Sequence, residues 1–483
     1  MAAEGAHQDV LRQDEVVAMK GGKGSPHGSG WRTPGRGLLS GRAERQSNEA
    51  GDTGNGIPRS PKSRPTCSSN GSLTRSLVRE LAPTTVLLLP LPVPYFDHNA
   101  TAPLHPAARA AWLEAADRFW ANPSSLYGQA TAARDLLADS RERLADLLGC
   151  NDPDRIVFTS GATAANNLLA RYLGRAARSD ALALVSPLEH PAVDVSIRAA
   201  FPGRVVETAV DGEGRVDPEE LSRVIDAHGE ARVASVSIMS ASNESGVLQP
   251  WQAIASLCRD RHIPFHTDAV QWLGKLPASG LAACDWVTGS GHKFGGPRGV
   301  GFLVVPAHAR FRGDLGGPQE QGQHAGTENL PGIAGMVAAL EAGERSLVDI
   351  AIRGAALRDA AIDLLRERLP VGRVVSGNAE RLWNTLAILV PGADSRKLVA
   401  ALDRAGIEAS TGSACSSGAA SAARVVAAIA PILGLAPGTP AGMVRFSAGP
   451  DTTAADWQAA IHALAEAVSV SAGPARPPRV DLR

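Results

Sequence analysis

The sequence is short of aromatic residues and cysteines for its 483 residues, and each shortage narrows the classes of protein that it can be. Aromatic side chains make up only 4% of it, so its core has to be aliphatic for the most part. The cysteines are odd in number, and no two have a CxxC spacing; they are Cys67, Cys150, Cys258, Cys284 and Cys415. This usage argues against a disulfide framework and against a zinc site made by protein ligands alone. It favours a reducing compartment, which we take to be the cytoplasm.

Long hydrophobic runs and a surplus of one charge are also missing. The apolar run at 86–93 (VLLLPLPV) is too short for a membrane helix and is broken by prolines. Lysine and arginine number 48 against 49 aspartate and glutamate residues, so the net charge is −1. A general binder of nucleic acid or of membrane surfaces needs a basic excess, so neither is expected as a partner.

Residues 1–94 differ in composition from the rest of the chain. They are rich in Gly, Ser, Pro and Arg and lack apolar periodicity, so we interpret them as disordered. They have no apolar core with a cleavage site, which argues against a targeting peptide. Our hypothesis is a mis-assigned start near Val93, because the ordered pattern begins at Tyr95 and no methionine lies between Met19 and Met239.

From residue 95 onwards, apolar strand-like runs alternate with helical stretches. Strands are predicted at 155–160, 181–186, 234–239, 264–267, 301–305, 373–376 and 386–389, and helices at 134–148, 162–173, 251–261, 346–369 and 454–468. This alternation predicts an α/β fold with a mostly parallel sheet, in which ligands gather at the carboxyl ends of strands. We expect a large domain at 111–345, a smaller α/β domain made from 95–110 and 346–470, and a tail at 471–483.

A lysine and an aspartate in two strand-end motifs carry the main chemical signal. Lys293 ends the turn Ser290-Gly-His-Lys293, where burial and a neighbouring cation would leave its amine neutral and able to form an imine with an aldehyde cofactor. Asp268 ends a short apolar segment, and a buried carboxylate needs a partner such as the pyridinium nitrogen of pyridoxal phosphate. A solvated lysine and a helix-capping aspartate are the plain alternatives. Their occurrence together, 25 residues apart, is more specific than either alone.

Further motifs offer groups for a phosphate, a ring and a carboxylate. The segment 159–163 (TSGAT) joins a strand to a helix and resembles a phosphate cradle, although most such sequences are only helix starts. Gln271 could hydrogen-bond a ring hydroxyl. His190 could act in catalysis, by stacking on a planar ring and handling protons near neutral pH, or serve as a structural hydrogen-bonding group. Arg445, in a strand-like segment, could hold a carboxylate or form an ordinary ion pair.

Cys415 stands apart from the other cysteines. It lies in the segment 411–418 (TGSACSSG), whose small residues are typical of an accessible, reactive thiol. Cys258 and Cys284 lie in apolar stretches, and we interpret both as core residues.

Ten segments, in a fixed order, resemble the cysteine desulfurases, which have the class V, aspartate aminotransferase-like fold of pyridoxal-phosphate enzymes. They are YFDHNATAP from 95, ANPSSLYG from 121, FTSGAT from 158, EH from 189, SNESG from 242, HTDAVQ from 266, SGHKFGGPRG from 290, AGTENLPG from 325, TGSACSSG from 411 and VRFSAG from 444. The resemblance covers residues 95 to about 468. It implies fold type I, with a large, mostly parallel domain that binds the cofactor and a smaller α/β domain.

The resemblance also implies a role for each site residue. Lys293 would hold the cofactor covalently and then transfer protons, Asp268 would pair with the ring nitrogen, and His190 would stack on the ring. The other implied contacts are those of Gln271 and Asn243 with the ring hydroxyl side, of Ala162, Thr163, Ser290 and His292 with the phosphate, and of Asn122 and Arg445 with the substrate carboxylate.

The reaction and the partners follow from the same resemblance. L-cysteine would become L-alanine, and Cys415 would take the sulfur as a persulfide and pass it to an acceptor or scaffold protein. The loop around Cys415 matches the branch that serves iron–sulfur cluster assembly, so this thiol is also a candidate transient ligand of such a cluster. Thr327 would reach the phosphate bound by a partner subunit, which implies a homodimer.

Several positions depart from the usual pattern of the family. Gln321 and His324 stand where arginines are usual, Tyr127 replaces a histidine, and 422–424 (AAR) replaces a common Pro-Ser-His. These changes bear on phosphate binding, on dimer electrostatics and on partner docking. The alternatives are a selenocysteine lyase, an aminotransferase or an epimerase on the same fold, or a weakly active partner in sulfur trafficking. Cys415 favours a desulfurase, because an aminotransferase needs no loop thiol.

The hypothesis of a start near Val93 predicts the peptide content of the native protein. Mass spectrometry of protein isolated from its own source should find no peptide from residues 20–80, because that stretch would never be translated. Native peptides from this stretch would disprove the hypothesis.

Overall fold

Helices and strands alternate along residues 106–304 and beyond, as the hydrophobic pattern predicts. The computed structural model describes residues 93–307, 309, 313, 316–412, 424–429 and 441–472, which all belong to one unit of the chain, Val86–Arg483. Cys67, Cys415 and nearly all of the predicted amino-terminal extension therefore lie outside the described residues.

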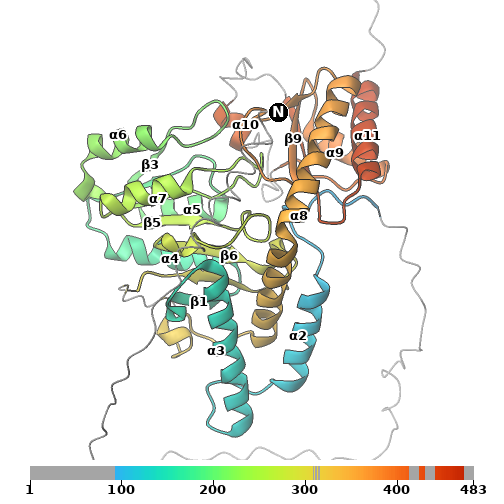
Figure 1. The fold of residues 1–483 in the computed structure, drawn as a ribbon. Helices are drawn as coiled ribbons and strands as arrows, with labels where there is room; N and C mark the ends of the chain where they lie inside the picture. The colour runs from blue at the N-terminus through green and yellow to red at the C-terminus, as the bar shows by residue number, and fades with distance from the viewer. Residues whose placement is uncertain are drawn as a thin grey trace, which may run out of the picture. The chain divides into compact units, whose positions relative to one another are not determined.

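A seven-stranded sheet forms the larger part of the described fold (Figure 1). Its strands are β1 (Ile156–Thr159), β2 (Leu182–Val185), β3 (Val205–Glu207), β4 (Val233–Ser237), β5 (Phe265–Asp268), β6 (Trp286–Ser290) and β7 (Gly301–Val304), in the order β1-β7-β6-β5-β4-β2-β3. Only β7 runs antiparallel to its neighbours, which confirms the predicted, mostly parallel α/β sheet. The carboxyl ends of the other strands therefore share one edge of the sheet.

Helices cover both faces of this sheet, as its strands require, since they are apolar on both sides. The helices are α2 (Pro106–Arg118), α3 (Gly128–Leu148), α4 (Ala162–Ala176), α5 (Pro191–Ala200), α6 (Pro218–His228) and α7 (Trp251–Asp260). Alternate residues of β1 show the two faces. Val157 joins the apolar cluster with residues of α4 and α5, whereas Ile156 and Phe158 join a second cluster with residues of α3 and α7.

A smaller antiparallel sheet is formed by the chain after residue 370. Its strands are β8 (Arg373–Val374), β9 (Thr385–Pro391) and β10 (Ala441–Ser447), in the order β10-β9-β8. The helices α9 (Ser395–Arg404) and α11 (Ala454–Ala472) pack together beside it, and α10 (Arg424–Ile429) is a short further helix (Figure 1). Residues near the start of the described chain join this region, because Asp97 pairs with Ser447 and Tyr95 with Glu408.

One long helix, α8 (Leu330–Arg368), corrects the prediction of a helix at 346–369. It begins earlier because Asn329 accepts a hydrogen bond from the backbone N–H of Gly332 and Pro331 lies in the first turn, an arrangement that favours a helix start. It packs against α2 and α3 and also against α11, so the predicted border at 345/346 falls inside one continuous helix (Figure 1).

The remaining element predictions agree with the structure to within a few residues for every strand and for most helices. The helices α2, α5, α6, α9 and α10 and the strand β3 were not predicted from the apolar pattern. Strand β3 is only three residues long and partly exposed, so it carries little apolar signal. The helix α2 buries only Ala108 and Ala115, too few residues to produce a clear stripe.

A buried ion pair fixes the segment before α8 to the large sheet. Glu320 is 6% exposed, and its carboxylate accepts two 2.8 Å hydrogen bonds from the guanidinium of Arg141 in α3. The same carboxylate accepts the backbone N–H of Phe158 in β1, and the Arg141 guanidinium lies over the ring of Phe158. Two neighbouring residues, Glu320 and Gln321, have positive φ angles of 48° and 57°, so local strain accompanies this arrangement.

We predict that Glu320→Gln lowers the free energy of unfolding by about 3 kcal/mol, because it leaves the buried Arg141 without its carboxylate. The control is Glu341→Gln, which breaks the more exposed pair with Arg143 and should cost about 1 kcal/mol or less. Urea unfolding of the two variants measures both values. Equal costs would show that the Arg141–Glu320 pair contributes no more than a surface pair.

Candidate active site

A cavity of about 810 Å³ lies at the carboxyl ends of the parallel strands. Residues that the sequence analysis selected line it together, although they come from separate strands and turns. They are Ala162, Thr163, His190, Asn243, Asp268, Gln271, Ser290, His292, Lys293 and Arg445. This position is the one that the topology of an open parallel sheet predicts for a ligand.

Lys293 follows β6 at the end of a short 3-10 turn (Gly291–Lys293). Its amine donates hydrogen bonds of 2.8 Å to the backbone carbonyls of Asn99 and Ala100. The turn is compact because Gly291 has no side chain: a Cβ there would lie 3.0 Å from a carbon of Met336. These two hydrogen bonds hold the amine at the cavity wall.

Asp268 ends β5 and is 7% exposed. One carboxylate oxygen accepts the backbone N–H of Val270 at 3.0 Å, and the other accepts the side-chain amide of Asn166 at 3.1 Å. Burial raises the pKa of Asp268, while these hydrogen bonds and the nearby His190 and Lys293 oppose the rise. The bond to Val270 caps the turn after β5, so a capping role, which the sequence analysis named as the alternative, is also present. The carboxylate also lines the cavity, where a cationic ligand atom would favour its ionised form.

His190 caps α5, and its Nδ1 accepts the backbone N–H of Ala192 at 3.1 Å. This bond places the ring proton on Nε2, and burial lowers the pKa of the imidazole, so the ring is neutral. Its neighbour Glu189 is completely buried; one oxygen accepts the N–H of Met239, and burial raises the pKa of its carboxyl well above the usual value. A neutral ring at this wall of the cavity is suited to stacking on a planar ligand.

The start of α4 offers backbone donors to an anion. Gly161 precedes the helix with a φ of 146°, and no side chain caps the first turn. Ala162, Thr163 and Ser290 line the cavity around this helix start. His292 also lines it; burial and then the charge of Lys293 lower the pKa of its imidazole to about 4. The donors of an uncapped helix start, two hydroxyl side chains and a positive dipole end fit a phosphate group.

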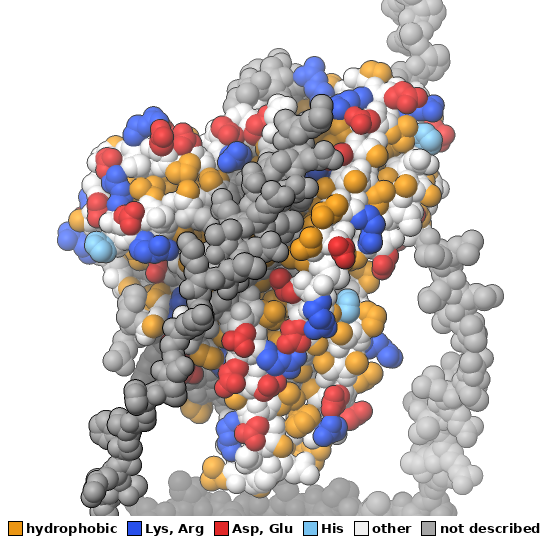
Figure 2. Space-filling model, in the orientation of Figure 1, with side chains coloured by type: hydrophobic (Ala, Val, Ile, Leu, Met, Phe, Trp, Pro, Cys, Tyr) orange, Lys and Arg blue, Asp and Glu red, His pale blue; other side chains and the backbone are white. Residues whose placement is uncertain are grey.

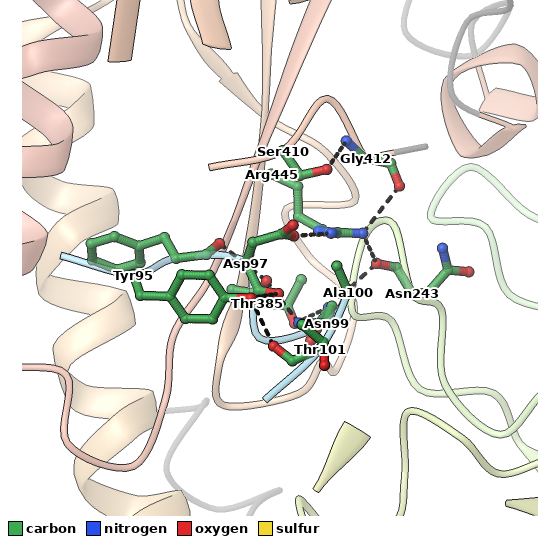
Figure 3. A network of polar contacts seen from close by, with 12 residues as sticks. Tyr95, Asp97, Asn99, Ala100, Thr101, Asn243, Thr385, Ser410, Gly412 and Arg445 are labelled. Carbon is green, nitrogen blue, oxygen red and sulfur yellow. Dashed lines mark hydrogen bonds and ion pairs between the residues drawn. The ribbon is translucent and has the colours of Figure 1, made fainter. Parts of the chain in front are cut away.

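Arg445 lies in β10 and is 2% exposed, and Figure 3 shows how its guanidinium joins several segments. Nη1 donates to the carbonyls of Asn243 (2.9 Å) and Gly412 (3.0 Å), and Nη2 contacts a carboxylate oxygen of Asp97 at 2.5 Å. The ion pair that the sequence analysis named as the alternative is therefore present. Nε of Arg445 is buried without a hydrogen-bond partner in the described chain, so one donor of this cavity-lining side chain is left for a ligand.

Sequence reasoning missed Asn99 as a site residue. It is 1% exposed, and its carbonyl accepts both the amine of Lys293 at 2.8 Å and the side-chain amide of Gln271 at 3.0 Å. The only signal was its place in the motif YFDHNATAP at 95, which carried the resemblance but no assigned role. Lys275, which bonds Gln271, and Arg424, which lines the cavity, were missed as well.

The other predicted site residues are not brought into the cavity within this one chain. Asn122 and Thr327 are exposed and do not line it, so their roles stay predictions. Cys415 lies outside the described residues, and Gly412 is the cavity-lining residue that precedes it. Of the departures, Gln321 donates to Asp154 at 2.7 Å. No cluster of three or more His, Cys, Asp or Glu suited to a metal, and no helix long and apolar enough to cross a membrane, occurs in the described part of the chain.

Comparison with known protein sequences gives matches over nearly all of the described residues. The family described as aminotransferase class-V matches residues 94–459. A cysteine desulfurase of Cereibacter sphaeroides is 36% identical over 379 residues, which cover 77% of this chain and 94% of that protein. A cysteine desulfurase of Gluconacetobacter diazotrophicus is 34% identical over 370 residues, which cover 75% and 90% of the two chains.

Solved structures share the same fold. A NifS-like protein superposes with a TM-score of 0.70 at 28% sequence identity, over 78% of this chain and 100% of that chain. The apo structure of a cysteine desulfurase from Thermococcus onnurineus NA1 gives a TM-score of 0.67 at 21% identity, over 78% and 95% of the two chains. The latter likeness bears on the fold alone.

The cradle at the start of α4 predicts binding of inorganic phosphate to the cofactor-free protein. Ser290→Ala should raise the dissociation constant of phosphate by up to about tenfold, because it removes one hydroxyl hydrogen bond to an anion. Ser140→Ala in α3 is the control, since that hydroxyl is buried without a partner among the described residues and does not line the cavity. Calorimetry measures both variants. Unchanged phosphate binding by Ser290→Ala would show that this side chain does not contact the phosphate.

Proposed function

The chain belongs to the class-V aminotransferases and, within them, to the cysteine desulfurases, and we propose that it removes sulfur from L-cysteine with pyridoxal phosphate held at Lys293 and with Cys415 as sulfur acceptor. One observation carries the proposal. The amine of Lys293, the carboxylate of Asp268 and the uncapped start of α4 line one cavity, which matches the aldehyde, ring nitrogen and phosphate of this cofactor.

The residues present fit the cofactor. Asp268 has a raised pKa and would gain a cationic partner in the ring nitrogen, while the start of α4, Thr163 and Ser290 supply phosphate donors. His190 offers a neutral ring for stacking. Asn243 and Gln271 would contact the cofactor on the side of its ring hydroxyl, and Ala162 and His292 would lie near its phosphate. When bound, pyridoxal phosphate supplies an electron sink that stabilises negative charge on the substrate carbons.

Lys293 would hold the cofactor and then move a proton at the substrate α-carbon. Its amine rests on two backbone carbonyls, which hold it in place without neutralising it. Once its covalent bond to the cofactor is exchanged for the substrate, the amine of Lys293 remains next to the ligand. It can then take a proton from the substrate α-carbon as a base and later return it. Arg445 would orient the substrate carboxylate through the N–H groups of its guanidinium, including the Nε that is unpaired among the described residues. Asn122 is the further predicted contact.

Cys415 would complete the reaction as the nucleophile. It follows Gly412, which lines the cavity, by three residues, so its Cα can be no more than about 11 Å from that of Gly412. The thiolate would attack the substrate sulfur, the carbon–sulfur bond would break, and a new sulfur–sulfur bond would form. The electron pair of the broken bond stays on the carbon, which takes up a proton and yields alanine, while Cys415 carries the persulfide.

The partners are proposed from the family and from the exposed residues. Trp120, Leu126 and Tyr127 are 67%, 94% and 52% exposed, and such large apolar side chains suit a homodimer interface that would also bring Thr327 to a partner site. On the face shown in Figure 2, acidic and basic side chains are interspersed, which does not favour nucleic acid. The sulfur would pass to an acceptor or scaffold protein for iron–sulfur cluster assembly in the cytoplasm, with Cys415 as a transient cluster ligand.

We predict that Cys415→Ser retains bound cofactor and binds L-cysteine but forms no protein persulfide, and that it releases alanine from cysteine at least about a hundredfold more slowly. Persulfide labelling followed by peptide mapping is the measurement. Cys258→Ala is the matched control and should keep the label, because burial raises the pKa of the Cys258 thiol to about 12 and leaves no thiolate to react.

Lys293→Ala, measured in the same experiment, distinguishes the role of the cofactor from the role of the thiol. It should lose both the visible absorption of bound cofactor and all alanine release, whereas Cys415→Ser loses only the latter. A label on Cys258 or Cys284, or full alanine release by Cys415→Ser, would contradict the desulfurase assignment and favour a selenocysteine lyase or an aminotransferase.

A further inference from the structure

Lys275 is a buried lysine to which neither the sequence nor the proposed reaction gives a role. It is only 4% exposed, and in the described structure its amine donates twice to the same residue: to Oε1 of Gln271 at 2.9 Å and to the backbone carbonyl of Gln271 at 3.3 Å. Burying an ammonium group is costly, and an ordinary lysine would reach solvent instead. Its contact with a cavity-lining side chain therefore needs an explanation.

The charged and titratable groups that act on Lys275 are unfavourable to it. Burial, followed by the charges of Lys293 and Arg445, lowers the pKa of its amine to about 7. Lys275 in turn helps to lower the pKa of the half-buried His98 to about 4, after burial itself. The partners that do stabilise the amine are thus the two oxygens of Gln271, and they are neutral.

A lysine beside a glutamine amide determines which way the amide faces. In the structure the amine of Lys275 donates to the oxygen of Gln271, and in its protonated form it can only donate, so that form requires the oxygen of Gln271 to face Lys275. The nitrogen then points to the opposite side, where Nε2 donates to the carbonyl of Asn99 at 3.0 Å. A reversed amide would set its NH₂ group against the ammonium and its oxygen against a carbonyl, and both contacts would be repulsive.

The backbone around Lys275 holds this arrangement in place. Gly274 has a φ of 71°, and a Cβ there would lie 2.4 Å from the Cβ of Phe294, so only glycine fits. The indole N–H of Trp383, from the segment that leads into β9, donates to the carbonyl of Lys275 at 3.1 Å. The lysine is therefore fixed on both sides rather than folded inward by chance.

We propose that Lys275 is a positioning residue that locks the amide of Gln271 with its N–H donors toward Asn99 and the cavity. Gln271 lines the cavity, so the amide N–H that Asn99 does not use is available to an acceptor oxygen on a bound ligand. In the proposed function, on which this inference rests, that acceptor is the ring oxygen of pyridoxal phosphate. A donor at this place favours the ionised form of the oxygen.

The test is a double-mutant cycle read by the pH dependence of the visible absorption of the bound cofactor. Lys275→Met frees the amide, and Gln271→Leu removes it, so each single change should raise the midpoint of the titration by about one pH unit. The double variant should match Gln271→Leu, because Lys275 acts through Gln271. A further rise in the double variant, equal to that of Lys275→Met alone, would show a direct charge effect and overturn the proposal.

An unshifted midpoint in Lys275→Met would also overturn it. Thermal unfolding checks that the fold is intact, which is expected because methionine replaces a buried amine with an apolar chain of similar length. If that variant does not fold, Lys275→Gln serves in the same cycle, since its neutral side chain is one atom shorter and loses the 2.9 Å contact. Absence of any visible cofactor band in the unmodified protein would instead count against the proposed function.

Discussion

The backbone carbonyl of Asn99 is the acceptor on which the arrangement of the cavity depends. Lys293 and Gln271 both donate to it, and they come from different turns after β6 and β5. The side chain of Asn99 is buried between the two sheets, where it donates to Thr385 at 3.0 Å and accepts from Asn384 at 3.1 Å. A buried amide with all of these bonds satisfied tolerates little displacement. Asn99 therefore links the candidate catalytic amine to Thr385 of β9 in the small sheet, and Figure 3 shows it beside Thr385.

The electrostatics of the cavity follow from this close approach. Lys275, Lys293 and Arg445 lie near one another, and Arg445 forms an ion pair with Asp97. Asp268 stands on the other side, where burial raises its pKa. A bound anion is favoured by these cations and by the start of α4, and a cationic ligand atom is favoured by Asp268.

The sequence predicted those parts of the fold that depend on local pattern. Strand β5 and the Asp268 that ends it were predicted together, because a charged residue at the end of an apolar run is visible in one dimension. Asn99 was not found as a site residue, since its partners Thr385 and Ser447 are 286 and 348 residues away. Lys275 has the appearance of a solvated lysine until the packing of Trp383 is known. The early start of α8 was not predicted because glycines such as Gly335 are unfavourable inside a helix. Here Gly335 allows the backbone of α2 to approach closely, since a Cβ at this position would lie 3.0 Å from the carbonyl of Ala108.

Two of the residues that depart from the family pattern, Gln321 and Arg424, have partners of their own. Arg424, in the altered segment 422–424, forms a 3.0 Å ion pair with Asp194, and the next residue, Val425, donates its N–H to Glu244. Asp194 belongs to the first turn of α5, directly after His190, so the start of α10 is attached to the wall that carries the imidazole. On the other flank, Gly412 is attached to Arg445. Both ends of the stretch that contains Cys415 are thus tied to the cavity. Arg424, at the position where a histidine is usual in the family, forms the attachment at the start of α10.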